Sequence, residues 1–293
     1  MITGDKTFGP GHERYELQRS IVDELAVVYF GRGTWWPKVP AGQWNVVTAQ
    51  DPFWRGLFAW RVAKRFHAKF NVQVHTDLGV YGWFKRALAK YVLGKATSVR
   101  VVSNKIKQQV EQMSAHANIS VLPVYVDVSR FKNLIREPHG IKTILWFGRF
   151  EDEKDPLLAI STFKEVLKSY HDAKLIMLGK GSLEVSLKHA AGGLAVEFPG
   201  WQDTAAYLAA ADVVLSTSKH ESWGASIVEA LAAGVPVVAP DVGIAREAGA
   251  TVVPKLELAK AVIEALHSNT RGVLALPLLT KDEWARAWVA TLQ

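Results

Sequence analysis

The protein has 293 residues, of which 49% are hydrophobic and none is cysteine, and its net charge is +7. This length predicts two domains of ordinary size, and the composition excludes disordered and fibrous chains. Without cysteine, neither disulfides nor thiolate metal sites can form. No apolar run reaches the roughly 18 residues of a membrane span, and MITGDKTFGPGHERYELQ (1–18) lacks the apolar core of a signal peptide. We therefore expect a cytoplasmic protein.

Positive charge is concentrated in the first half of the chain. Residues 1–140 contain 20 Lys and Arg against 10 Asp and Glu, whereas residues 141–293 contain 15 against 18. The excess is densest in two amphipathic stretches with aromatic residues, WRVAKRFHAKF (60–70) and FKRALAKYVLGKATSVR (84–100). They form either a solvated basic face or a peripheral contact with anionic lipid at the inner face of a membrane, where each basic residue contributes about 1 kcal/mol. Nucleic acid is a third class of partner, but no recognition motif supports it.

Strand-like segments alternate with helical patterns along most of the chain. We predict strands, in chain order, at residues 45–50, 71–76, 98–103, 119–123, 142–148, 174–179, 212–217, 235–240 and 250–254. Helical patterns include residues 156–170, 203–211, 256–268 and 281–293. This alternation predicts an α/β protein with two Rossmann-like, doubly wound parallel-sheet domains that face each other across a cleft. Ligands of such sheets bind beyond the carboxyl ends of the strands.

The alternation is interrupted once, at a polar segment that we interpret as a linker. This segment is SRFKNLIREPHGIK (129–142), which contains Pro138 and Gly140. We therefore predict a compact N-terminal domain over residues 1–135 and a C-terminal domain over residues 136–293. The last helix, 281–293, is expected to pack back on the linker.

Small and basic residues follow three predicted strands of the second domain. Arg149 and Lys154 come after the first of these strands and can bind phosphate, Arg149 through two parallel hydrogen bonds. The N-terminus of a helix offers free N–H groups and a positive dipole end to the same kind of ligand. The two glycine turns that suit it are Gly179-Lys180-Gly181 and Gly224-Ala225-Ser226. Each signal is weak alone, but together they predict a site for an anionic ligand.

Two glutamates, Glu221 and Glu229, lie in the segment KHESWGASIVEALAAGVPVVAP (219–240). A helical wheel places Glu229 among alanines, opposite the apolar residues Ile227, Val228 and Leu231, which indicates a covered helix that keeps one carboxylate for a specific partner. Carboxylates accept hydrogen bonds from hydroxyls, so the pair suits a sugar and a ribose. The alternatives are a glycosidase acid–base pair, which this position beside a phosphate-binding turn disfavours, and a purely structural pair.

The motifs and their order resemble a known family. ESWGASIVEALAAGVPVVA (221–239) resembles the E-x7-E signature of retaining nucleotide-sugar glycosyltransferases of the GT-B fold, in particular glycosyltransferase family four, the group 1 glycosyl transferases. Phe147-Gly148-Arg149 with Glu153-Lys154 is similar to the phosphate motif G-R-x-x-x-E-K of that family. Further similar segments are DVGIAREAGA (241–250), AQDPFWRGLFAW (49–60), VQVHTD (72–77) and VLPVYVDVSRF (121–131), where Val124-Tyr125 replace the usual Asn-Gly.

The resemblance implies a retaining hexosyltransferase that moves a sugar from a nucleotide-diphosphate sugar, by default a UDP-sugar, to a hydroxyl of a glycan or lipid-linked acceptor. It implies that Arg149 and Lys154 bind the donor diphosphate, Glu221 the sugar hydroxyls and Glu229 the ribose. Other donor-side residues would be Gly148, Gly179, Gly224, Ala225 and Ser226. The acceptor side would include Gly9, Gly11, His75 and Asp77, and the catalytic residues would be His75, Arg149, Lys154 and Glu221.

No D-x-D metal motif is present, and two basic side chains can replace a divalent ion, so we expect neither a metal nor a cofactor. VEFPGWQD (196–203) is expected to border the nucleobase, although Trp201 suits core packing equally well. The chain departs from the family in its short first strand at MITG, which leaves open whether residues precede Met1, and in its loop GDKTFGPGHE (4–13). A nucleotide-sugar 2-epimerase of the same architecture and a non-catalytic nucleotide-sugar-binding protein stay as alternatives, and the oligomeric state stays open.

Overall fold

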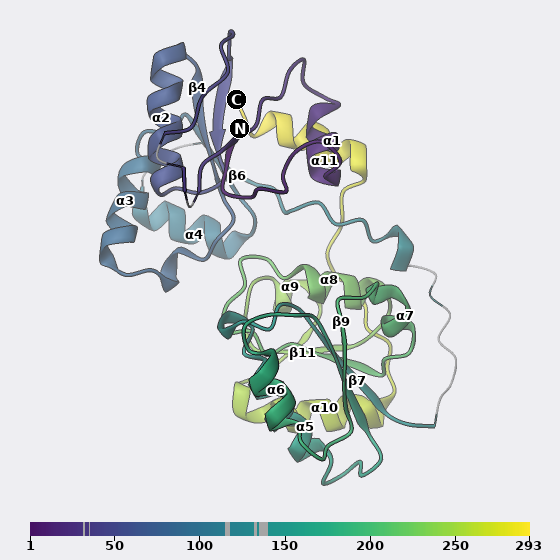
Figure 1. Cartoon of the computed structure of the whole chain (residues 1–293). Helices are drawn as coiled ribbons and strands as arrows, with labels where there is room; N and C mark the ends of the chain where they lie inside the picture. Colours follow the sequence, from purple (N-terminus) through teal and green to yellow (C-terminus); the bar gives the residue numbers. More distant parts are fainter. Residues whose placement is uncertain (32, 35, 115–117, 132–133, 135–139) are drawn as a thin grey trace. The chain divides into compact units, whose positions relative to one another are not determined.

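The computed structural model describes all residues except 32, 35, 115–117, 132–133 and 135–139, and the chain divides into two compact units (Figure 1). Unit 1 comprises Met1–Tyr125 together with Leu278–Gln293, and unit 2 comprises Val126–Pro277. The predicted boundary between residues 135 and 136, and half of the predicted linker 129–142, lie outside the described residues.

The described part of unit 1 contains a six-stranded parallel sheet with the strand order β2-β1-β3-β4-β5-β6. Its strands are β1 (Ile2–Thr3), β2 (Val28–Tyr29), β3 (Val46–Ala49), β4 (Lys69–Val74), β5 (Ser98–Val101) and β6 (Ile119–Val121). The four strands predicted in this half are confirmed. The sequence missed β1 and β2, because segments of two residues show no hydrophobic alternation.

Five α-helices flank this sheet in the described residues: α1 (Glu13–Arg19), α2 (Trp54–Phe66), α3 (Trp83–Leu93), α4 (Asn104–Met113) and α11 (Lys281–Ala290). The basic stretch at residues 60–70 therefore runs from α2 into β4, and the stretch at residues 84–100 runs from α3 into β5. Helix α2 ends because His67 takes the left-handed conformation, with φ 51°, which turns the chain into β4.

Helix α11 is the last helix in the chain but belongs to unit 1. Its Trp284 and Trp288 are buried in a cluster with Phe8, Leu17 and Leu122, and Figure 1 shows α11 in yellow beside α1 in purple. The carbonyl of Thr291 accepts hydrogen bonds from Asn71 Nδ2 at 2.8 Å and Ser98 Oγ at 3.0 Å. The assignment of residues 281–293 to the C-terminal domain thus differs from this division, because two buried tryptophans tie the helix to the first sheet.

Unit 2 contains a second six-stranded parallel sheet in its described residues, with the order β12-β11-β10-β7-β8-β9. The strands are β7 (Thr143–Phe147), β8 (Lys174–Leu178), β9 (Val196–Gly200), β10 (Val213–Leu215), β11 (Val237–Ala239) and β12 (Thr251–Val252). The five strands predicted in this half are confirmed. The sequence missed β9, because Pro199 and Gly200 lower the strand signal of VEFPG.

The helices of unit 2 cover the two faces of this sheet. They are α5 (Pro156–Val166), α6 (Glu184–Ala190), α7 (Thr204–Ala209), α8 (Ala225–Ala232), α9 (Ala245–Ala248) and α10 (Leu258–Ser268). Phe163 of α5 and Val262 of α10 pack against Ile144 and Met177 in one buried cluster. Pro156 is the first residue of α5, where its missing N–H leaves no hydrogen bond unmade.

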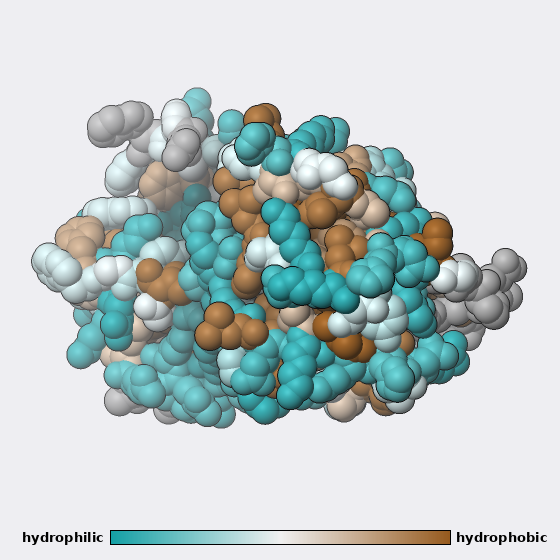
Figure 2. All heavy atoms as spheres, turned by 90° about the horizontal axis from the view of Figure 1, so that it is seen from below, coloured by the Kyte–Doolittle hydropathy of each residue, from teal (hydrophilic) through white to brown (hydrophobic). Residues whose placement is uncertain are grey.

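The predicted fold class, two Rossmann-like doubly wound α/β units, is confirmed. The cleft expected between the units stays a prediction. On the face shown in Figure 2, hydrophilic side chains separate smaller groups of hydrophobic ones. Among the described helices, none has the combination of length and hydrophobicity that crossing a bilayer requires.

Candidate donor and acceptor sites

The order of strands in unit 2 reverses between β7 and β10, so the loops that follow these two strands meet at one edge of the sheet. Such a reversal is where open α/β sheets bind ligands. Two hydrogen bonds join the loops: Lys219 N donates to Glu153 O at 2.9 Å, and Thr217 Oγ1 donates to Lys154 O at 3.0 Å. Trp146 Nε1 donates to the same Thr217 hydroxyl at 2.9 Å, which anchors the junction in the core.

Lys154 and Glu221 form an ion pair across this junction. Ser218 Oγ also donates to Glu221 Oε1, at 2.8 Å. The side chains are 21% and 12% exposed, so the pair is largely shielded from water but still reachable from outside. The structure thus brings together two of the predicted donor residues, 67 positions apart in the chain, as an ammonium and a carboxylate that a ligand can separate.

Arg149 lies on the same loop but is much more exposed. Its side chain is 64% exposed and pairs with Glu153, Nη2 to Oε1 at 2.7 Å. The short helical turn Asp152–Lys154 between them is held from both sides: Lys219 Nζ bonds Asp152 at 2.5 Å and Lys255 Nζ bonds Asp155 at 2.7 Å. The guanidinium of Arg149 is therefore an exposed cation beside the shielded cation of Lys154.

Gly148 and Gly179 form a close backbone contact between the loops that follow β7 and β8. Gly148 and Gly179 have φ of 157° and 149°, and a Cβ on Gly179 would lie 1.9 Å from the Gly148 carbonyl oxygen. Gly148 N donates to Leu178 O, and Gly179 N donates to Gly200 O, both at 3.0 Å. Gly179 therefore allows the loops after β7 and β8 to lie against each other, whereas a Cβ on Gly148 would come no closer than 3.5 Å to the Trp146 ring.

The N-terminus of α8 opens at the same edge. Gly224 precedes it with φ 109° and provides no side-chain cap. The N–H groups of Ala225 and Ser226, at the start of the helix, have no intrahelical partner and lie at the positive end of its dipole. The carbonyl of the neighbouring, buried Trp223 accepts a hydrogen bond from Ile244 N at 2.9 Å. That contact holds the helix start in place.

Glu229 lies further along α8 and is half-buried. Ile227, Val228 and Leu231 are buried, as the helical wheel predicted. Burial raises the pKa of Glu229, while the charge of Arg130 and the hydroxyl of Thr204 oppose that shift. Arg130 itself pairs with Asp203 at 3.2 Å. Because burial disfavours the charged form of this carboxylate, hydrogen bonds from ligand hydroxyls would stabilise it.

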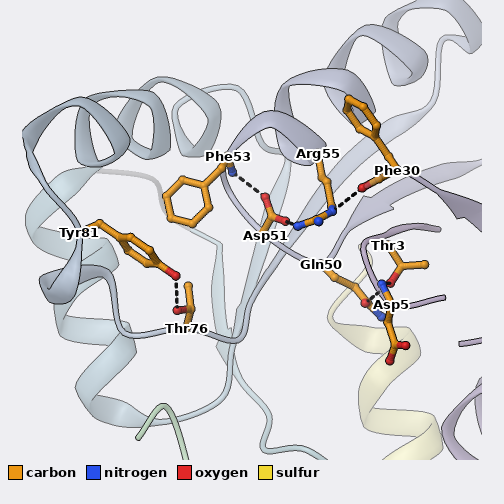
Figure 3. A network of polar contacts seen from close by, with 9 residues as sticks. All are labelled: Thr3, Asp5, Phe30, Gln50, Asp51, Phe53, Arg55, Thr76 and Tyr81. Carbon is orange, nitrogen blue, oxygen red and sulfur yellow. Dashed lines mark hydrogen bonds and ion pairs between the residues drawn. The ribbon is translucent and has the colours of Figure 1, made fainter. Parts of the chain in front are cut away.

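The corresponding edge of unit 1 is a network of polar side chains after β1 and β3 (Figure 3). Thr3 Oγ1 donates to Gln50 Oε1 at 2.6 Å, and Arg55 joins Asp51 at 2.5 Å to the Phe30 carbonyl at 2.7 Å. These groups satisfy one another, so the network shapes the edge and its loops rather than presenting free charge.

His75 follows β4 at this edge, and its Nε2 lies 3.4 Å from Arg100 Nη1. Burial, and then the charges of Arg100 and Arg14, hold the pKa of His75 well below its ordinary 6.5. The imidazole is therefore neutral at neutral pH. Because a guanidinium only donates, this contact assigns the ring proton to Nδ1.

The other predicted acceptor-side residues have different surroundings. The carboxylate of Asp77 accepts from Gly79 N at 2.9 Å and Gln109 Nε2 at 2.7 Å, and it pairs with Lys105. It is thus occupied within its own unit. Gly9 and Gly11 form the turn before α1, where a Cβ on either would meet nothing within 4 Å.

Sequence reasoning missed Ser218, Arg14 and Arg100 as neighbours of the predicted residues. Arg100 had a usable signal, because a charged residue inside the apolar strand pattern SVRVVS needs a specific partner. Trp201 is 55% exposed, so the alternative of core packing for it is wrong. Among the described residues, no group of three or more His, Asp or Glu side chains is arranged to hold a metal ion.

Two doubly wound parallel-sheet units are the GT-B fold, which glycosyltransferases of known structure have. Solved structures share this fold: Anabaena HepE, crystallised with UDP and glucose, aligns with a TM-score of 0.67 at 17% identity, over 85% of this chain and 74% of that one. Residues 141–268 match the family of Glycosyl transferases group 1, so the expected resemblance is confirmed.

Curated glycosyltransferases are similar to parts of this chain. A relative from Bacillus subtilis, named as a candidate teichuronic acid biosynthesis glycosyltransferase, TuaC, is 31% identical over 59% of this chain and 44% of its own length. The alpha-monoglucosyldiacylglycerol synthase of Streptococcus pneumoniae is 26% identical over 67% of this chain and 52% of its own. The chain thus spans about half the length of the curated relatives it matches.

Proposed function

We propose that the protein is a retaining, metal-independent hexosyltransferase that moves a sugar from a nucleotide-diphosphate sugar to a hydroxyl of a glycan or lipid-linked acceptor. The observation that carries the proposal is the ion pair of Lys154 and Glu221 at the strand reversal of unit 2. A cation, a carboxylate and the N-terminus of α8 thus lie at the same edge of the sheet in unit 2. A diphosphate sugar needs these three groups, because it has an anionic end and a hydroxylated end.

Donor binding would replace the ion pair with two contacts to the ligand. The diphosphate oxygens would accept from Lys154 Nζ, from Arg149 and from the N–H groups of Ala225 and Ser226. Sugar hydroxyls would donate to the carboxylate of Glu221, and the ribose hydroxyls would donate to Glu229. Each charged group then keeps a partner, so no buried charge is left unpaired on binding.

Breaking the bond between the sugar and the diphosphate develops negative charge on the leaving group and positive charge on the sugar ring. Preorganised donors at the leaving group stabilise that charge, and removal of one typically costs a factor of about 100–1,000 in rate. Attack from the same face, with the departing phosphate taking the proton of the acceptor hydroxyl, would retain the anomeric configuration. Lys154 and Arg149 supply the charge that a divalent ion would supply elsewhere.

UDP is the first nucleotide to test, because a protein of the same fold was crystallised with it. A thermal-shift panel of UDP, GDP, ADP and their sugars tests the proposal, since a ligand at about 100 times its dissociation constant stabilises by about 2.7 kcal/mol. Activity that EDTA abolishes and magnesium restores would contradict metal independence. Donor binding without nucleotide release, whatever acceptor is offered, would indicate a non-catalytic binding protein.

Unit 1 presents a basic aromatic surface that we propose as a contact with anionic membranes, such as the inner face of a cell membrane. Trp83, at the start of α3, is 81% exposed, and Phe84 beside it is also exposed. Lys85 lies over the Tyr81 ring at 4.7 Å. Aromatic rings that enter the interface, with cations beside them, suit an anionic bilayer.

Liposome pelleting at low and high salt measures this contact. We expect binding to anionic vesicles at low salt, weaker binding in the variant Trp83→Ala, and little change in the control Val185→Ala, which alters an exposed residue of unit 2. Equal pelleting of the two variants, or no wild-type binding at low salt, would contradict the membrane surface.

A further inference from the structure

Unit 1 contains a buried arginine that no carboxylate of the described residues neutralises. Arg100, on β5, is 1% exposed. Its guanidinium donates to the carbonyls of Leu122 at 3.0 Å and Pro123 at 2.8 Å, and to Gln73 Oε1 at 2.7 Å. These acceptors are all neutral. A guanidinium pays a large desolvation cost in such a site, and neutral acceptors offset only part of it.

A second arginine, Arg14, lies in the first turn of α1. It is half-buried, and no hydrogen bond or ion pair of its side chain is found within the described residues. Its guanidinium lies over the Phe8 ring, 5.9 Å from the centroid. Burial lowers the pKa of Arg14, and the charges of Asp5 and Glu13 oppose the shift. Thr7 donates two hydrogen bonds to Oδ1 of Asp5, from its N at 2.9 Å and its Oγ1 at 2.6 Å.

The two arginines and His75 act on one another at the carboxyl edge of the sheet. Arg14 lies over the Phe8 ring and Arg100 lies 5.3 Å from the centroid of the Trp284 ring, and these two rings belong to one buried cluster. The charge of Arg14 also lowers the pKa of both His75 and Arg100, and that of Arg100 falls to about 9, mainly through burial. Two positive charges, those of Arg14 and Arg100, repel each other more strongly where burial keeps water away. An anionic ligand would relieve this repulsion. His75, protonated on Nδ1, adds a neutral donor for such a ligand.

We propose that Arg14 and His75 bind a phosphate or carboxylate group of the acceptor substrate, with Arg100 as the positioning residue that orients the His75 ring. This proposal rests on the proposed function, because only a transferase has an acceptor. It places the anion in the unit to which the sequence assigned acceptor binding, beside the Gly9–Gly11 turn that leads into α1. Arg14 supplies the direct charge, whereas the hydrogen bonds of Arg100 are almost all used within the unit.

Inorganic phosphate is the probe for this site, and the full-length variant Lys154→Ala is the host, since it lacks the main donor-side cation. Calorimetry measures the affinity, and the ring ¹⁵N signals of His75 report the place of binding. We expect saturable shifts of the His75 signals and a loss of affinity of about tenfold or more in Arg14→Gln, as for a lost charged hydrogen bond. Arg14→Lys, which keeps the charge, should lose less.

The matched control is Arg19→Gln, which removes an exposed cation in the last turn of the same helix. We expect its phosphate affinity to stay within about twofold of the host, because the charge lies outside the site. Equal affinities of Arg14→Gln and Arg19→Gln, or His75 signals that phosphate does not move, would overturn the proposal. The His75 signals also report on Arg100→Gln, where a change of tautomer is expected without loss of the fold.

A parallel titration with UDP separates the two possible sources of the anion. If the site serves the acceptor, Arg14→Gln binds UDP like the wild type. A loss of about tenfold in UDP affinity would instead assign Arg14 to the donor diphosphate and overturn the acceptor assignment. Absence of UDP, GDP and ADP binding to the wild type would contradict the proposed function alone, since the phosphate result with His75 would stand.

Discussion

The carboxyl edges of the two sheets hold their cations in different ways. In unit 2, Lys154 pairs with Glu221 and Arg149 pairs with Glu153. In unit 1, Arg100 is held by neutral acceptors, and the side chain of Arg14 contacts the Phe8 ring but forms no hydrogen bond or ion pair within the described residues. An edge whose cations already have carboxylates must exchange partners with its ligand, whereas an edge without them gains a partner on binding. The two edges should therefore respond differently to the same substitutions.

The largest effect is expected at the paired edge of unit 2. Lys154→Ala removes the shielded cation, and we expect kcat to fall by about 100–1,000-fold, because the leaving diphosphate loses a preorganised donor. The control Lys188→Ala removes an exposed cation that pairs with Glu184 on the same helix, α6. Steady-state kinetics and melting curves provide the comparison. Transfer within about threefold of the wild type in Lys154→Ala, with normal melting, would defeat the assignment of this residue.

The next largest effect is expected at the contact between Gly148 and Gly179, where the loops after β7 and β8 meet. In Gly179→Ala the new Cβ would collide with the Gly148 carbonyl, so we expect a loss of stability of about 1–3 kcal/mol, typical of overpacking. Gly193→Ala is the matched control, because Gly193 also has a positive φ, 78°, but a Cβ there meets nothing within 4 Å. Denaturant unfolding measures both. Equal losses would mean that backbone conformation, and not the contact between the loops, requires glycine at position 179.

Glu229→Gln is expected to have two smaller effects: it should raise the stability of the free protein and weaken nucleotide binding. Burial raises the pKa of this group above its ordinary value of 4.5, so the stability it contributes is present below that value and is lost as pH rises through the folded pKa. Glu229→Gln should therefore melt higher than the wild type at pH 7.5, and the gap should close as the pH falls below the ordinary pKa of 4.5. A variant that melts lower than the wild type at pH 7.5 would contradict this.

Glu229→Gln should at the same time weaken nucleotide binding by about tenfold, because an amide is a poorer acceptor for ribose hydroxyls than a carboxylate. Calorimetry with UDP measures this loss. Unchanged affinity would remove Glu229 from the donor site while leaving Lys154 in it. Greater stability with less binding is the expected behaviour of a residue kept for a ligand.

The comparison also shows what the sequence could predict. Nine strands and the donor edge of unit 2 were predictable, because glycines and cations directly follow periodic apolar runs. The ion pair of Lys154 and Glu221 was not, since its partners come from different strands and meet only through the strand order. In unit 1 the strands β1 and β2 are too short to show a period. The place of Arg14 depends on a turn that no local pattern specifies, and α11 joins unit 1 through two tryptophans far along the chain.

Calorimetric titration of UDP, and of GDP and ADP if UDP does not bind, into the wild type, Lys154→Ala and Arg14→Gln tests the central claim most directly. The account predicts that one of these nucleotides binds the wild type and Arg14→Gln equally and binds Lys154→Ala at least about tenfold more weakly. Equal binding to the wild type and Lys154→Ala, or no nucleotide binding at all, would contradict it.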